Sequence, residues 1–321
     1  MTNSTDAWAQ DALKTLLHDG VIEQRRRRRW GIFFKTLFLF LFVWLITALN
    51  TEEKHLPKHI GESHVALINV SGPILAGAPA GASRVVHGLE KAFKDPYTKG
   101  VILRINSPGG SPVESDIVYQ HIKQLRHEHP KVKLMAVCDD ICASGAYYIA
   151  SAADDIYANP ASLVGSIGVI MNGFGFVDAI QKLGISRRAF IAGQNKDFLD
   201  PFKPLNAAQV NNVKQMLDEV HQIFIARVKA GRGKRLKVKP DTFTGLVWTG
   251  KTAKTMGLID GFGDTDFVTK KVFKQKYIVD YTAQRPLFER LARRFGASFG
   301  AALSESAFQT LMSTSAMRES V

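Results

Sequence analysis

The sequence predicts an α/β fold with a mainly parallel sheet, preceded by one N-terminal transmembrane helix. Strand-like and helix-like segments alternate from residue 64 onward, as they do in chains of βαβ units. A long apolar run near the N-terminus directly follows five arginines. The composition, with 45% hydrophobic and 22% charged residues among 321, is that of a globular protein. Two cysteines are too few for a disulfide-stapled secreted domain.

The N-terminal segment joins a basic run, Arg25–Arg29, to the apolar run Ile32–Leu49, whose only charge is Lys35. At ~1.5 Å per helical residue the apolar run spans about 27 Å, close to the thickness of a hydrocarbon core. No small-residue cleavage site follows, so an uncleaved signal anchor is favoured over a cleaved signal peptide or a buried core helix. The positive-inside rule places residues 1–30 in the cytoplasm, 31–50 in a bacterial inner membrane and the rest in the periplasm. This placement argues against a nucleic-acid role for the arginines.

A polar linker, 51–63, leads to a domain expected over 64–283, and residues 284–321 form a small, polar and basic tail. Apolar runs between turn residues predict the strands, and amphipathic runs predict the helices. The expected strands or extended segments are His64–Val70, Gly100–Asn106, Lys133–Val137, Ile156–Ala158, Ser186–Ile191 and Lys276–Tyr281. The expected helices are Ser83–Lys94, Pro112–Glu128, Ser144–Ala153, Val177–Leu183, Ala207–Lys229, Thr252–Met256 and Thr265–Lys274.

Two glycines, Gly109 and Gly110, lie in the turn Asn106–Ser111, between the second expected strand and the next helix. Such a turn exposes backbone N–H groups at a helix N-terminus, where they can bind an oxyanion or another anion. An ordinary strand-to-helix turn contains the same residue types, so the motif alone does not indicate a function.

Ser144 follows the third expected strand and a turn, Cys138–Ile141, and it opens an apolar helix. A serine at this position is commonly an N-cap. The alternative is a nucleophile whose developing negative charge is stabilised by the helix dipole. Cys142 and Ala146 stand where the G-x-S-x-G elbow has glycines, so that motif is not present.

A nucleophilic serine needs a base, and no histidine lies between Pro130 and Glu219. A serine–lysine pair is a known variant of the catalytic triad. Among the lysines that follow Ser144, Lys196 and Lys203 lie in one loop, whereas Lys182, Lys214 and Lys229 lie on expected helices. Spacing alone does not choose between the two loop lysines.

Six segments, taken together and in order, resemble the short, membrane-anchored bacterial form of the signal peptide peptidase A family. They are VILRINSPGG, ASGAYYIASAAD, IYANPASLVGSIGVI, GQNKDFLDPFKPL, AGRGK and GLVWTGKTAKTMGLIDGFGD. The resemblance implies that Ser144 is the nucleophile, in the A-S-G-[GA]-Y-Y motif, and that Lys196 is the general base. It also implies that Ser166, in the G-S-I-G motif, orients the lysine.

The same resemblance implies that backbone N–H groups at Gly109, Gly110 and Gly145 are the oxyanion donors. It implies the ββα superhelix of crotonases and of Clp protease subunits, and neither a cofactor nor a metal. Domains of this fold associate side by side into closed rings, so we expect a homo-oligomer, most simply an octamer with its sites facing an enclosed space.

Three other patterns have plainer interpretations. Gly245–Thr252 fits the phosphate-loop pattern G-x-x-x-x-G-K-[ST], but no buried strand is expected before it, so a structural turn is favoured. The basic segment Arg227–Lys239 is interpreted as a solvated loop rather than as a lipid-binding face. Cys138 and Cys142 are close enough in sequence to pair, but free, partly buried thiols are favoured.

The predicted function is a membrane-anchored serine endopeptidase with a Ser144–Lys196 dyad, acting on apolar peptides such as signal-peptide remnants. We expect its activity to rise from acid toward alkaline pH, because a lysine base must first lose its proton. One alternative is a crotonase-fold acyl-CoA enzyme, which needs no serine nucleophile. The other is a non-catalytic membrane scaffold.

Overall fold

The computed structural model describes residues 24–44 and 61–283, which belong to two compact units, Met1–Ile60 and Gly61–Val321. In the first unit, residues 24–44 form one helix whose apolar side chains are exposed. Over the described ranges, no helix combines the length and the apolar character needed to cross a membrane. The predicted span 31–50 ends outside the described residues, as does the predicted tail 284–321.

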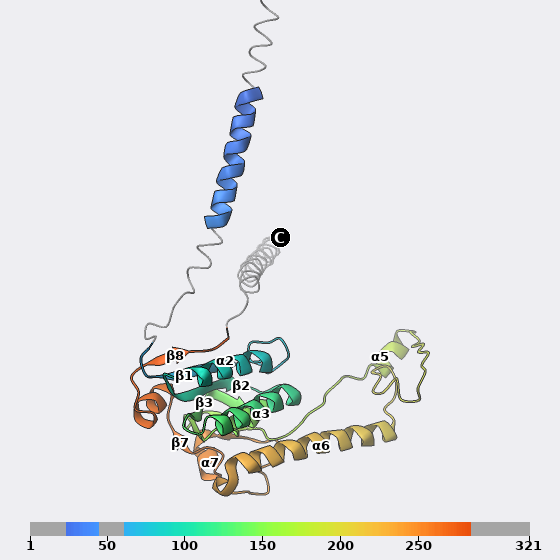
Figure 1. The fold of residues 1–321 in the computed structure, drawn as a ribbon. Coiled ribbons are helices and arrows are strands. Elements are labelled where there is room, and N and C mark those ends of the chain that lie inside the picture. Colours follow the sequence, from blue (N-terminus) through green and yellow to red (C-terminus); the bar gives the residue numbers. More distant parts are fainter. Residues whose placement is uncertain (1–23, 45–60, 284–321) are drawn as a thin grey trace, which may run out of the picture. The chain divides into compact units, whose positions relative to one another are not determined.

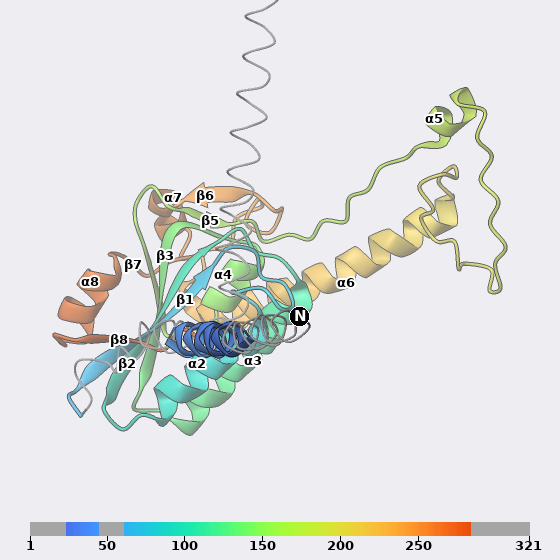
Figure 2. The same ribbon diagram turned by 90° about the horizontal axis from the view of Figure 1, so that it is seen from above.

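The second unit is built on an eight-stranded sheet with the strand order β6-β5-β3-β2-β1-β8, and β4 and β7 branch from β3 (Figures 1 and 2). Every strand pair is parallel except β5 with β6, which confirms the predicted mainly parallel sheet. The strands are β1 His64–Ser71, β2 Thr98–Ser107, β3 Lys133–Ala143, β4 Asp155–Ala158, β5 Leu163–Gly165, β6 Val247–Thr249, β7 Gly261–Phe262 and β8 Ile278–Asp280.

Helices pack on both faces of this sheet because its strands alternate their side chains between the faces. Ala66 and Ile68 of β1 belong to the larger core cluster, shared with the helices α2, α3, α4 and α6, whereas Val65 belongs to a smaller cluster with Val268. The helices are α2 Ala82–Lys94, α3 Pro112–Glu128, α4 Gly145–Ala150, α5 Val177–Lys182, α6 Ala207–Arg232, α7 Gly250–Thr255 and α8 Thr265–Phe267. A 3₁₀ turn, Gly233–Arg235, follows α6, and a π turn, Val268–Val272, follows α8.

Strand β3 is longer than the sequence predicts, because the expected turn Cys138–Ile141 is a bulge within one strand. Cys138 pairs with Ile105 of β2 and Cys142 pairs with Ser107, so β3 holds two more residues than β2 in this interval. Ser186–Ile191, expected to be extended, forms no strand. Strands β5, β6 and β7 were not predicted, because runs of two or three residues carry no periodic signal.

The basic segment Arg227–Lys239 is not the solvated loop that the sequence suggests. Helix α6 continues to Arg232, whose side chain is only 1% exposed and makes a bidentate ion pair with Asp260, at 2.7 and 2.8 Å. Burial alone would raise the pKa of Asp260, but the hydrogen bonds and charge of Arg232 outweigh it and lower that pKa below its usual range. The arginine thus fixes the end of α6 to the loop before β7.

The remaining two patterns agree with their plainer interpretations. Gly245–Thr252 forms β6 and the start of α7, and Trp248 of β6 faces Val164 of β5, so these residues are structural. Cys138 and Cys142 are both free thiols, and both are buried rather than partly buried. Burial, together with a hydrogen bond to Cys138, raises the pKa of the Cys142 thiol well above its ordinary value.

Candidate active site

Ser144 lies between β3 and α4, on a turn whose backbone is strained. Its φ of 54° and ψ of −125° fall in a region that residues other than glycine rarely adopt. Its side chain makes no capping hydrogen bond to α4, so the structure does not support the N-cap interpretation. A strained serine between a strand and a helix is the backbone arrangement of a nucleophile elbow, even though the flanking residues do not match that motif.

Two glycines allow a very close approach between the turn before α3 and the turn before α4. A Cβ atom on Gly145 would lie 2.4 Å from Oγ of Ser115, and one on Gly109 would lie 2.8 Å from Cβ of Ser144. Ser115 is fully buried, and its hydroxyl donates to the carbonyl of Ser111 at 2.9 Å. The close packing brings the backbone of the turn before α3 beside the Ser144 side chain.

The N–H groups of these turns differ in whether they are already engaged. The N–H of Gly109 donates to Oγ of Ser107 at 3.1 Å, so it is not a free donor in this structure. Within the described part of the chain, the N–H groups of Gly110 and Gly145 have no hydrogen-bond partner. Of the three oxyanion donors expected from the sequence, Gly110 and Gly145 are thus the two whose N–H groups are not engaged among the described residues.

The turn Asn106–Ser111, which we call the glycine turn, is held in place by hydrogen bonds to Ile74 in the loop after β1. The N–H of Ile74 donates to the carbonyl of Gly109 at 2.9 Å, and the carbonyl of Ile74 accepts from Ser111 N–H at 2.8 Å. These two hydrogen bonds form an isolated parallel β-bridge between Ile74 and Gly110. The N–H groups of the turn are thus fixed before any ligand binds.

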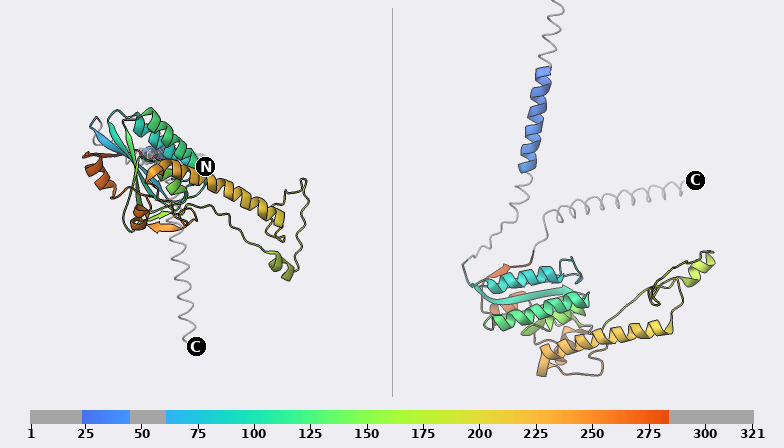
Figure 3. Two further views of the ribbon diagram at one scale, coloured as in Figure 1. Left: turned by 90° about the horizontal axis from the view of Figure 1, so that it is seen from below. Right: turned by 45° about the vertical axis from the view of Figure 1, so that its right-hand side comes forward.

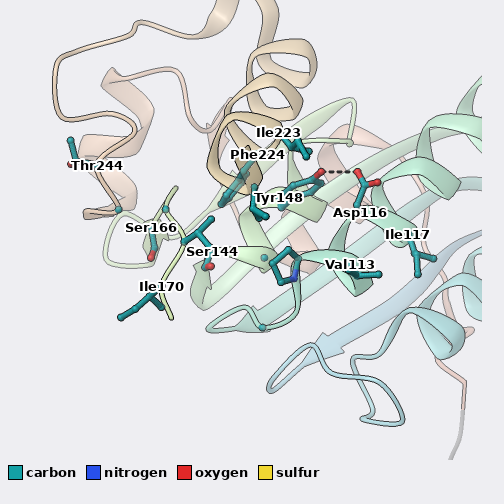
Figure 4. A pocket seen from close by; sticks show the side chains of 17 residues that line it. Val113, Asp116, Ile117, Ser144, Tyr148, Ser166, Ile170, Ile223, Phe224 and Thr244 are labelled. Atoms are coloured by element: carbon teal, nitrogen blue, oxygen red, sulfur yellow. Dashed lines mark hydrogen bonds between the residues drawn. The ribbon is translucent and has the colours of Figure 1, made fainter. Parts of the chain in front are cut away.

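Ser166 lies next to Ser144 because β5 pairs with the end of β3. Ala143 faces Gly165 across this pair, and the N–H of Ser144 donates to the carbonyl of Gly165 at 2.8 Å. Ser166 has a left-handed φ of 51°, and its N–H donates to the carbonyl of Leu246 at 2.8 Å. Figure 4 shows both serine side chains beside one cavity. The structure therefore brings together these two residues from distant motifs.

The cavity beside the serines has a volume of about 690 Å³ and a mostly apolar wall. Its apolar side chains come from α3, from the segment after β5 and from α6: Val113, Ile117, Ile170, Val220, Ile223 and Phe224. Among the described residues, no histidine, lysine or arginine lines this cavity. The cavity offers space for an apolar peptide, but the described residues of the protein place no basic side chain in it.

A hydrogen-bond network at one end of the cavity links three helices. Tyr148 of α4 donates its phenol proton to Asp116 of α3 at 2.6 Å (Figure 4). Arg227 of α6 donates to the same oxygen at 3.1 Å. Burial, followed by the hydrogen bond to Asp116, raises the pKa of Tyr148 far above its ordinary value. Tyr148 thus stays protonated near neutral pH and acts as a structural donor rather than a base. The sequence did not single out Asp116, because one carboxylate on an amphipathic helix carries no motif.

Lys196 lies elsewhere, in what we call the arm, residues 170–206. Figures 1, 2 and 3 show α5 and the following segment away from the sheet, near the N-terminal end of α6. Lys196 lines a separate cavity there with Arg187, Phe190 and Asp200. Within one chain the structure does not bring Lys196 to Ser144, so the predicted dyad stays a prediction.

Comparison with known proteins identifies the family. A family model described as Peptidase family S49 matches residues 126–278. "Putative protease slr0021" of Synechocystis sp. is 32% identical over 199 residues, which are 62% of this chain and 69% of that protein. The chain belongs to peptidase family S49, the signal peptide peptidase A family. The S49 match contains Ser144, Ser166 and Lys196, whereas the glycine turn precedes it.

Other relatives of this member of family S49 are longer than the segment that matches. "Na(+)/H(+) antiporter NhaA" of Brucella abortus is 41% identical over 220 residues, which are 67% of this chain and 30% of that protein. "Putative signal peptide peptidase SppA" of Enterococcus faecium is 27% identical over 194 residues, or 60% of this chain and 56% of that protein. The chain thus spans 30% of the length of the first curated relatives it matches. The antiporter name describes that whole protein.

Proposed function

We propose that the chain is a serine endopeptidase in which Ser144 attacks the peptide bond and Lys196 is the general base. The observation that carries this proposal is the turn at Ser144, which is strained, leaves the hydroxyl uncapped and opens on an apolar cavity. A strained backbone of this kind is destabilising by about 1–3 kcal/mol and is typical of active sites. The N–H groups of Gly110 and Gly145, which have no hydrogen-bond partner among the described residues, adjoin the same turn.

In the proposed mechanism, the neutral amine of Lys196 accepts the Ser144 hydroxyl proton while Oγ bonds to the substrate carbonyl carbon. The resulting oxyanion accepts hydrogen bonds from the N–H groups of Gly110 and Gly145. The carbon–nitrogen bond then breaks as the lysine ammonium gives its proton to the leaving nitrogen. Water hydrolyses the acyl-enzyme ester in the same way and restores Ser144. Ser166, beside Ser144, would hold the amine in line with Oγ.

The base is proposed to come from a neighbouring copy of the chain. Two observations support this: no lysine lines the Ser144 cavity in the described chain, and the arm exposes apolar side chains that a partner could cover. Phe190 is 98% exposed, and Phe174 and Leu205 are 82% and 74% exposed. We therefore propose a homo-oligomer, with the octamer expected from the family as its simplest form. The branching of the sheet at β3 supports the crotonase-like superhelix within each copy.

The proposed substrates are apolar peptides at a membrane, such as signal-peptide remnants. The apolar lining of the Ser144 cavity supports this substrate class. The exposed aromatic and aliphatic side chains of the helix 24–44, next to Arg25–Arg29, support an anchor over 31–50 with the domain in the periplasm. Protease added to spheroplasts should then remove the domain and spare the arginine run. A reporter fused after residue 60 that behaves as cytoplasmic would contradict this topology.

A fluorophosphonate probe tests the nucleophile directly. The full chain, in detergent or in membranes, should be labelled on Ser144, and the label should be absent from Ser144→Ala while Ser186→Ala, at an exposed serine of the arm, is labelled as the wild type is. Cleavage of an apolar fluorogenic peptide should follow the same pattern. Labelling or cleavage that persists in Ser144→Ala would show that another residue is the nucleophile.

A further inference from the structure

His221, on α6, is the last histidine of the sequence, and the proposed mechanism does not use it. Its Nε2 atom lies 3.1 Å from the carbonyl oxygen of Ile167, the residue that follows Ser166. Because a carbonyl oxygen can only accept a hydrogen bond, the proton of this bond must be on Nε2. The His221 ring is thus a donor that joins α6 to the segment after β5.

The acceptor of this bond lies in the core. Ile167 is 0% exposed and belongs to the larger core cluster, so water does not reach its carbonyl oxygen. Within residues 24–44 and 61–283, the bond from His221 is the only hydrogen bond that this carbonyl accepts. A buried carbonyl that loses its only donor is destabilised, because no water replaces the lost bond. Removal of the His221 donor should therefore disturb the backbone around Ile167.

Ser166 depends on this stretch of backbone for its position. The N–H of Gly168 donates to the carbonyl of Ser166 at 2.9 Å, which closes a three-residue turn centred on Ile167. On the other side of Ser166, β5 pairs with β3, and the N–H of Ser166 itself donates to Leu246 at 2.8 Å. The left-handed φ of 51° at Ser166 is unfavourable for a residue with a Cβ, so it must be imposed by contacts of this kind. The bond from His221 is the contact that holds the turn after Ser166 to α6.

We propose that His221 is a positioning residue for Ser166: by holding the carbonyl of Ile167, it keeps the Ser166 hydroxyl beside Ser144. This inference rests on the proposed roles of Ser144 and Ser166. His221 itself neither touches the substrate nor exchanges a proton with it, since among the residues that the structure describes no histidine lines the Ser144 cavity. Helix α6 thus positions a residue of the site, in addition to the apolar side chains that it contributes to the cavity wall.

The test is peptide cleavage by the full chain carrying His221→Leu or His221→Gln. Leucine cannot donate a hydrogen bond, whereas the glutamine amide can donate from about the position of Nε2. We expect His221→Leu to lower kcat about threefold to tenfold, the effect of one hydrogen bond, with KM unchanged, and His221→Gln to recover most of the wild-type kcat. Gln222→Leu changes the exposed neighbouring residue of α6 in the same way, should leave both constants unchanged, and serves as the matched control.

A double-mutant cycle tests whether His221 acts through Ser166. Once Ser166→Gly has removed the hydroxyl, loss of the His221 bond should have little further effect, so the double variant His221→Leu/Ser166→Gly should cleave at about the rate of Ser166→Gly alone. Additive losses in the double variant would overturn the inference. So would a wild-type kcat in His221→Leu, a rise in KM without a fall in kcat, or a loss of activity that His221→Gln does not recover.

Two further variants separate a failure of this inference from a failure of the proposed function. Cleavage by Ser144→Ala would refute the proposed function, and the role of His221 with it. Wild-type activity in Ser166→Gly would refute the role of Ser166 and therefore also that of His221. An inactive Ser144→Ala and a slowed Ser166→Gly, together with an unchanged His221→Leu, would refute only the role of His221.

Discussion

The sheet and the arm differ in what holds their functional residues in place. Around Ser144 the side chains of Ala146, Tyr147 and Ile149 are all 0% exposed, and the turns are fixed by backbone hydrogen bonds. In the arm, α5 has no buried residue, and α6, which follows the arm, buries its side chains only from Phe224 onward. The proposed nucleophile belongs to a packed core, whereas the proposed base belongs to a segment with few buried side chains.

If Ser144 and Lys196 form one site, this difference means that a single chain builds its two halves to unequal degrees. Gly110, Gly145 and Ser166 already surround Ser144, and all of them are positioned by strand pairing and close packing. Lys196 lines a separate cavity of the arm and has no contact with the cavity at Ser144. Catalysis by a Ser144–Lys196 pair would thus depend on an association that covers the exposed apolar side chains of the arm.

The largest expected effect is at the nucleophile. Ser144→Ala should lower the rate of peptide cleavage at least about 10³-fold, because removing one member of a catalytic unit abolishes nearly all of the activity of that unit. Since the uncapped hydroxyl makes no bond to α4, the free energy of unfolding should change by less than about 1 kcal/mol. Peptide cleavage and urea unfolding measure the two quantities. Unfolding of this variant under native conditions would show that Ser144 is structural.

The second prediction tests whether the two half-sites come from different copies. Lys196→Ala and Lys196→Arg should both be inactive, since a guanidinium cannot give up its proton to act as a base. Mixing Ser144→Ala with Lys196→Ala subunits and allowing them to exchange should restore about a quarter of the activity, because one neighbouring pair in four combines both intact residues. Two inactive variants that stay inactive after proven subunit exchange would place both residues of a working site in one chain.

The third prediction concerns the core alone. Asp260→Asn leaves the buried charge of Arg232 without a partner and should lower the free energy of unfolding by about 3 kcal/mol. Because the pKa of Asp260 is lowered in the folded protein, its stabilisation is complete above about pH 4 and is lost as the pH falls through the folded value. Urea unfolding at neutral and acid pH should show the wild type and the variant converging in acid. An equal difference at both pH values would contradict this account.

The smallest expected effect is at Ser166. Ser166→Gly removes the hydroxyl and is compatible with the left-handed backbone, so it should lower activity about tenfold, the effect of one hydrogen bond, without loss of stability. Ser166→Ala should lose a similar amount of activity, and Ser166→Gly should be the more stable of the two, because only glycine lacks the Cβ that is strained at a φ of 51°. Activity and thermal unfolding of both variants separate the two effects. Wild-type activity in Ser166→Gly would remove Ser166 from the site.

Most strands of the sheet and the helices packed on it were predicted from the sequence, because their periodic patterns are long. The expected helix Pro112–Glu128 and the first strand from His64 agree with the structure, and so does the helix after Ser144. What it could not predict depends on contacts between distant residues. The strand β5 and the pairing of Ala143 with Gly165 exist only because the chain returns to β3, and this return is what places Ser166 beside Ser144.

For the site, residue types were easier to predict than their geometry. Ser144 was singled out, but its strained backbone was not, because the G-x-S-x-G glycines are missing. Gly109 was an equal candidate to Gly110, and only the hydrogen bond from Gly109 N–H to Ser107 distinguishes them. The family resemblance supplied Lys196, yet no pattern in the sequence places it on an arm away from the serine.

The bulge in β3 restricts how many residues can be inserted or deleted just before Ser144 without turning the following side chains to the other face. Cys138 and Cys142 face residues of β2 that are two apart, Ile105 and Ser107, so the bulge adds an even number of residues to β3. Deleting both Asp139 and Asp140 would restore a regular ladder and leave the following residues on their present faces. Deleting only one would turn every later side chain to the opposite face and carry Ser144 out of its cavity. Related chains that vary in length at this point are therefore expected to differ by two residues rather than by one.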